Sequence, residues 1–130
     1  MFKLTSILLL PASPVDGKAL LTIAASIETF SPHPIGKAIV DAARKNHCKM
    51  RRVENFRAFS GLGVGGLLDG LAVIMGSADF LRESRVQIDA RLLRGAGEWK
   101  DGGDSAVFCA WEARAKGVLR LSPIREGTED

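Results

Sequence analysis

The stretch Val64-Gly65-Gly66-Leu67-Leu68-Asp69-Gly70-Leu71-Ala72-Val73-Ile74-Met75 carries the strongest fold signal in this sequence. Two apolar runs, 64–68 and 71–75, flank the dipeptide Asp69-Gly70, which is typical of a two-residue hairpin turn. Strands joined by so tight a turn pair antiparallel. The stretch therefore predicts an antiparallel sheet as the basis of the fold.

Upstream of this hairpin, the sequence predicts two helices joined by a rigid corner. Asp16 is a suitable N-cap for the first helix, whose apolar residues recur at helical spacing between Leu20 and Phe30. The segment Ser31-Pro32-His33-Pro34 forces a turn, because the residue before a proline is disfavoured in a helix. Pro34 itself suits the first turn of the second helix. We therefore expect a helix hairpin with residues 31–34 at its apex.

The remaining elements complete an α+β pattern. Further strands are expected at Phe2–Leu10, Val53–Phe59, Ala106–Trp111 and Gly117–Leu121, with one short helix capped by Ser77 and another from about Ile88 to Trp99. The order is strand, helix pair, three strands, helices and two strands. It predicts a twisted antiparallel sheet of about six strands, flanked by helical hairpins.

Composition places the chain among ordinary globular domains. Its 130 residues are 46% apolar and 25% charged, which suits one domain over residues 1–130. The formal charge is +3 and the basic residues are scattered, so we expect no nucleic-acid partner. The apolar stretch Ile7–Leu10 is too short to span a membrane. Cys48 and Cys109 match no zinc or disulfide spacing, which favours a reducing, cytoplasmic setting.

The apex of the helix hairpin is the first candidate site. Glu28 stands at the end of one helix and His33 on the proline corner before the next, so both side chains can point at one spot. A carboxylate can accept the amino group of adenine, and an imidazole can stack on the ring or hydrogen-bond to it. From the spacing alone, a solvated glutamate and a backbone-capping histidine are the alternative.

A glycine-rich segment, Ser60-Gly61-Leu62-Gly63-Val64-Gly65-Gly66, is the second candidate. It formally matches the dinucleotide fingerprint G-x-G-x-x-G, but a strand follows it where that fingerprint requires a helix. The partner motifs of a protein-kinase glycine loop are absent from the chain. A main chain without side chains lets a flat or anionic ligand approach closely, whereas glycines at a β-bulge are the alternative. Met75-Gly76-Ser77, where a strand turns into a helix, is a weaker anion signal.

A metal-binding or metallochaperone domain using His47 and Cys48 is the alternative function. Structural zinc takes four ligands, and the sequence supplies no cluster around this pair, so we predict no metal site. No nucleophile, base and orienting third group can be combined either. We therefore predict no catalytic residue.

Several of these segments occur in an order that resembles the nucleotide-binding (N) domain of heavy-metal-transporting P-type ATPases. They are Glu28, then Ser31-Pro32-His33-Pro34-Ile35-Gly36-Lys37-Ala38-Ile39, then Gly61-Leu62-Gly63-Val64, then Ile74-Met75-Gly76. The resemblance covers almost the whole chain, and Phe2–Ile7, Val118–Leu121 and Ile124-Arg125 resemble the family's hinge strands. It implies an N-domain-like fold, excised as an insertion from a larger membrane transporter, with its two termini side by side.

The resemblance also implies a nucleotide site. Its residues are Glu28, His33, Gly61, Gly63 and Gly76, supported by Ser31, Pro34 and Ser77. By that likeness, Glu28 accepts the adenine amino group and His33 contacts the ring. Gly61 and Gly63 leave room for the purine and ribose, and Gly76 lies near the start of the phosphate chain. The family has asparagine where this chain has Ser77, and an aspartate that is missing at Ser122-Pro123.

The family's phosphorylation motif, aspartate-lysine-threonine-glycine-threonine, does not occur in this sequence. The resemblance therefore implies a domain that binds ATP, as Mg-ATP in the parent protein, but is inactive alone. Its expected partners are ATP or ADP and the phosphorylation and actuator domains of the same parent chain. We expect a monomer on the cytoplasmic side of an integral membrane transporter, with no membrane insertion of its own. The transported metal is not indicated.

Overall fold

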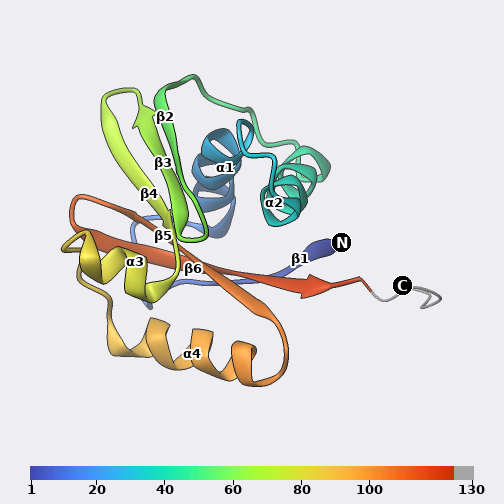
Figure 1. Cartoon of the computed structure of the whole chain (residues 1–130), viewed down its shortest axis with the longest axis vertical. Coiled ribbons are helices and arrows are strands. Elements are labelled where there is room, and N and C mark those ends of the chain that lie inside the picture. The colour runs from blue at the N-terminus through green and yellow to red at the C-terminus, as the bar shows by residue number, and fades with distance from the viewer. Residues whose placement is uncertain (125–130) are drawn as a thin grey trace.

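One antiparallel sheet organises the computed structural model, which describes residues 1–124 (Figure 1). The strand order is β1-β6-β5-β4-β3-β2, and every neighbouring pair is antiparallel. The strands are β1 (Phe2–Leu8), β2 (Val53–Phe59), β3 (Gly63–Leu68), β4 (Leu71–Gly76), β5 (Ser105–Trp111) and β6 (Arg114–Pro123). The helices are α1 (Gly17–Glu28), α2 (Pro34–Lys45), α3 (Ala78–Glu83) and α4 (Ala90–Asp101). The predicted α+β fold is confirmed.

The central hairpin forms as its sequence predicts. Leu68 pairs with Leu71, and the two turn residues Asp69 and Gly70 have φ angles of 51° and 82°. Positive φ at both central residues matches the right-handed twist of the flanking strands. This hairpin sets the register of β3 and β4, and so places Gly63 opposite Gly76.

The helix hairpin also follows its local signals. The side chain of Asp16 accepts a hydrogen bond of 2.7 Å from the amide of Ala19, which caps α1. Pro34 occupies the first turn of α2, where its missing N–H costs nothing. The proline corner thus holds the C-terminus of α1 beside the N-terminus of α2.

Helices cover both faces of the sheet, and β5 shows how. Cys109 and Trp111 belong to the hydrophobic cluster under α1 and α2, whereas Phe108 and Ala110 belong to the cluster under α3 and α4. Successive side chains of a strand point to opposite faces. A strand buried on both faces needs apolar residues throughout, which explains the uninterrupted run at 106–111.

Several element boundaries differ from the predicted ones, and α4 and β6 each end two residues later, at Asp101 and Pro123. β1 ends at Leu8, two residues early. α4 begins at Ala90 rather than near Ile88, because Gln87 is held in an extended bridge opposite Arg114. β6 begins at Arg114 because Glu112 and Ala113 form a two-residue turn with φ of 55° and 61°, without the asparagine or glycine that usually marks one.

The two ends of the described chain lie together. Phe2 pairs with Pro123, and the Ile124 amide donates to the Met1 carbonyl at 2.8 Å. Arg125, part of the predicted hinge segment, lies outside the described residues. Within residues 1–124, no helix has the length and hydropathy to cross a membrane.

Candidate functional site

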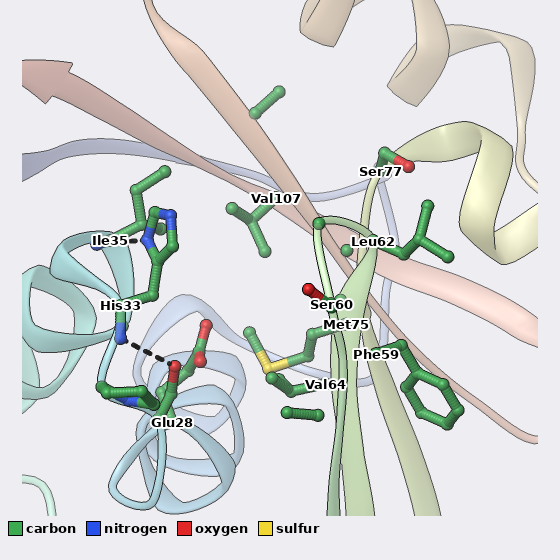
Figure 2. A pocket seen from close by; sticks show the side chains of 18 residues that line it. Glu28, His33, Ile35, Phe59, Ser60, Leu62, Val64, Met75, Ser77 and Val107 are labelled. Atoms are coloured by element: carbon green, nitrogen blue, oxygen red, sulfur yellow. Dashed lines mark hydrogen bonds between the residues drawn. The ribbon is translucent and has the colours of Figure 1, made fainter.

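A pocket of about 460 Å³ opens between the helix hairpin and the glycine-rich edge of the sheet (Figure 2). The α1–α2 corner forms one wall, and the β2–β3 turn with the ends of β3 and β4 forms the other. The start of β5 closes the space between them, at Ala106 and Val107. Pockets of this size, mostly apolar with a few polar groups, are typical of small-molecule sites.

Glu28 is the acidic group of this pocket. It is the last residue of α1 and is only 6% exposed. Burial raises the pKa of the Glu28 carboxyl to about 7, while a hydrogen bond from the Ser31 hydroxyl opposes that rise. Within residues 1–124, no cation pairs with Glu28. The pocket thus holds a carboxylate with capacity to accept a donor from a ligand.

His33 stands at the mouth of the same pocket, where it caps α2. Its Nδ1 accepts a hydrogen bond of 3.1 Å from the Ile35 amide, and its own amide donates to Ser31 Oγ at 3.2 Å. When Nδ1 accepts a hydrogen bond, the proton of the neutral imidazole is on Nε2. The cap therefore leaves Nε2–H as the donor available to a ligand.

Ser31 connects the two groups. One hydroxyl donates to the Glu28 carboxylate and accepts from the His33 amide. A hydroxyl has one donor and two acceptor positions, so both bonds can form at once. The α1–α2 corner therefore orients an acceptor and a donor toward one space, and Figure 2 shows both side chains on that side of the pocket.

Three glycines expose main chain on the opposite wall. Gly61 has φ of 75° in the β2–β3 turn, and a Cβ there would meet open space. A Cβ on Gly63 would collide with the Met75 carbonyl oxygen and the Phe80 ring, and one on Gly76 with the Leu62 carbonyl oxygen. Strand pairing and the packing of Phe80 therefore require glycine at 63 and 76, whatever the pocket holds.

The supporting residues divide into two groups. Ser31 and Ser77 line the pocket, whereas Pro34 begins α2 and does not line it. Ser77 Oγ accepts a hydrogen bond of 3.2 Å from the Phe80 amide and so caps α3, as predicted. The structure thus gathers Glu28, His33 and the three glycines around one space, and their roles in binding stay predictions.

Several lining residues lie outside the predicted nucleotide site. Gly36 packs against the carboxylate: a Cβ there would lie 3.0 Å from Glu28 Oε1. Met75 and Val64 are buried lining residues, while Phe59 and Leu62 are partly exposed at the edge. The sequence predicts the strands that carry Val64 and Met75, β3 and β4. It does not show which face of these strands packs against the helix hairpin.

His47 and Cys48, the alternative metal pair, lie away from this pocket. Cys48 is buried and belongs to the hydrophobic cluster under α1 and α2. His47 has φ of 57° in the turn after α2. Across residues 1–124, no group of three or more histidine, cysteine, aspartate or glutamate side chains gathers as a metal site would require. Nothing here favours the metal-binding function.

Comparison with known proteins identifies the family. No family model matches the chain. It is 36% identical over 103 residues to the copper-exporting P-type ATPase B of Archaeoglobus fulgidus, a match that covers 79% of this chain and 14% of that protein. Its structure matches the N-domain of HMA6, a copper-transporting P-type ATPase, with a TM-score of 0.76 at 22% identity. That match covers 93% of this chain and 98% of the other. The chain belongs to the heavy-metal P-type ATPase family and has the fold of its N-domain.

A second solved structure contains the same fold as part of a longer chain. A catalytic domain of the CPx-ATPase CopB-B, whose conformation changes on nucleotide binding, matches with a TM-score of 0.68 at 20% identity. This N-domain covers 40% of that chain. The chain spans about one seventh of the length of the Archaeoglobus fulgidus relative. The predicted family is confirmed by that relative.

Proposed function

We propose that this N-domain binds ATP through its adenine ring and presents the γ-phosphate to a separate phosphorylation domain of a heavy-metal cation-transporting P-type ATPase. The observation that carries the proposal is the buried Glu28 carboxylate beside the His33 imidazole, across the pocket from the main chain of three glycines. A buried carboxylate is unfavourable unless donors meet its acceptor positions, and Ser31 supplies only one hydroxyl donor. The exocyclic amine of adenine is such a donor.

The rest of the pocket suits a flat heterocycle. Met75, Val64 and Val107 give it apolar walls, and Gly63 and Gly76 expose main chain between these side chains. Nε2–H of His33 can donate to a ring nitrogen, or the imidazole can stack on the purine. The carboxylate then sets which edge of the purine enters, and the walls exclude water from that contact.

In the parent protein, ATP enters as Mg-ATP and the domain works with the phosphorylation and actuator domains of the same chain. The adjacent strands β1 and β6 suit an inserted domain joined through two neighbouring chain ends. Such a domain would lie on the cytoplasmic side of the membrane and act as a monomer. The nucleophile would come from the phosphorylation domain, so this domain alone is expected to release no phosphate from ATP.

Removing either polar group is expected to weaken ATP binding without unfolding the domain. Glu28→Ala and His33→Ala each delete a partner of a ligand hydrogen bond, which is worth about 1–3 kcal/mol, or roughly 5- to 150-fold in Kd. Calorimetric titration with ATP measures the loss, and thermal unfolding checks the fold. Glu54→Ala, at an exposed strand position, and His47→Asn are matched controls. Unchanged Kd in both pocket variants would refute the proposal.

Guanine is expected to bind less well than adenine. Its O6 is an acceptor where Glu28 needs a donor, so two acceptors would face each other. At pH 8, above the Glu28 pKa of about 7, the carboxylate is ionised and we expect ATP to bind about tenfold more tightly than GTP. In Glu28→Gln the amide can present either an oxygen or an NH₂ group, so the preference should shrink. Equal Kd values for ATP and GTP in the native domain would contradict the assignment of Glu28.

A further inference from the structure

A second, smaller hollow of about 140 Å³ adjoins the pocket. The two share Ser77 and Ala106 as lining residues, so they meet at the N-terminus of α3 and the start of β5. α4 forms the far wall of the second hollow through Gly97 and Lys100. The small side chains at 77, 78, 96 and 106, with a glycine at 97, keep this space open.

The two hollows differ in charge. No lysine or arginine lines the first pocket, so nothing in it compensates a polyanion. Lys100 lines the second and is exposed. Among residues 1–124, Lys100 forms no ion pair, whereas the arginines at 51, 82, 91 and 120 do. Its ammonium group is therefore available to an incoming anion.

Two acids on or near the helices that flank the hollow form ion pairs with arginines rather than with Lys100. Asp104, just beyond α4, pairs with Arg120 at 2.7 Å, and that guanidinium also stacks over Trp99. Asp79 on α3 pairs with Arg82 at 3.7 Å. Asp79 and Asp104 are thus engaged with other cations, and among the residues that line the hollow Lys100 is the one that carries a charge.

We propose that the second hollow is a phosphate subsite in which Lys100 binds the phosphate chain of the nucleotide. This inference rests on the proposed adenine site. With the purine at Glu28 and His33, the chain leaves the first pocket past Ser77 and Ala106, the two residues that border both hollows. Lys100 contributes as a flexible point charge, so it favours nucleotides with more phosphates over adenosine.

The test compares adenosine with ATP in magnesium-free buffer by calorimetry. In Lys100→Ala, the Kd of ATP is expected to rise roughly fivefold, while the Kd of adenosine stays the same. Lys100→Arg should retain most of the ATP affinity. Lys45→Ala is the matched control, because Lys45 is also an exposed basic residue in the last turn of a 12-residue helix, away from both hollows. It should change neither Kd.

Amide chemical shifts provide a second measurement. ATP, but not adenosine, is expected to shift the amides of Gly97 and Lys100. An ATP-to-adenosine affinity ratio that is the same in Lys100→Ala and the native domain would overturn the subsite. Adenosine that fails to bind while ATP binding still depends on Lys100 would overturn the adenine site and support the subsite. Binding of neither ligand would overturn both.

Discussion

Replacing Glu28 with glutamine is expected to stabilise the folded domain at pH 8 by about 3 kcal/mol while weakening ATP binding. Burial raises the pKa of Glu28 from 4.5 to about 7, so the ionised carboxylate is less favourable in the folded domain than in the unfolded chain. One pKa unit corresponds to about 1.4 kcal/mol, and the shift of about 2.5 units gives the expected gain. A neutral amide of the same shape avoids that cost and can still accept from Ser31.

The sign of this effect sets its pH dependence. Between pH 4.5 and 7 the folded domain binds more protons at Glu28 than the unfolded chain, so the native domain loses stability as pH rises through that window. Below pH 4.5 the Glu28 carboxyl is protonated in both the folded and the unfolded chain. The native domain and the Glu28→Gln variant should then have nearly the same stability. The difference in free energy of unfolding between Glu28→Gln and the native domain grows up to about pH 7 and is constant above it.

Urea unfolding at pH 4.5, 6 and 8 measures this difference directly, and a rise in Tm of roughly 10 °C at pH 8 should accompany it. Glu54→Gln at an exposed position of β2 is the control, because it relieves no burial. A Glu28→Gln variant that is no more stable than the native domain at pH 8 would show that the carboxylate is not desolvated. The combination of greater stability and weaker ATP binding would mark Glu28 as a residue retained for function.

The second large effect is expected at Gly63. An alanine Cβ there would collide with the Met75 carbonyl oxygen and lie 2.7 Å from the Phe80 ring, which is itself held against Phe59 with ring centroids 5.1 Å apart. Neither the paired backbone of β4 nor the packed ring can yield easily. Gly63→Ala is therefore expected to lower the free energy of unfolding by about 3 kcal/mol, the upper range for overpacking.

Gly97→Ala is the matched control for this change. A Cβ on Gly97 meets nothing within 4 Å, and alanine is favoured over glycine inside a helix, so this variant should be stabilised by about 0.5–1 kcal/mol. Urea unfolding of both variants tests the contrast. Equal stability of Gly63→Ala and the native domain would mean that β3 and β4 can separate at the pocket, and that Gly63 serves only to admit a ligand.

Local signals carried much of the fold. The turn at Asp69-Gly70, the caps at Asp16 and Ser77 and the corner before Pro34 were predictable because each depends on a few neighbouring residues. The family resemblance rested on motifs of the same short range. The errors came where a distant partner acts. Gln87 forms a bridge with Arg114, so α4 begins later than its sequence predicts. The turn at 112–113 contains no asparagine or glycine to mark it.

The sequence by itself determined the kinds of element, their order and the residue types at the α1–α2 corner. Only the tertiary structure decided that Glu28 is buried against Gly36, that its corner faces Gly63 and Gly76 across a pocket, and that Lys100 lines an adjoining hollow. The physical reason is how far apart along the sequence the interacting residues are. Helix caps and tight turns are set within a few residues, whereas burial, pKa and cavity shape depend on segments brought together from across the chain.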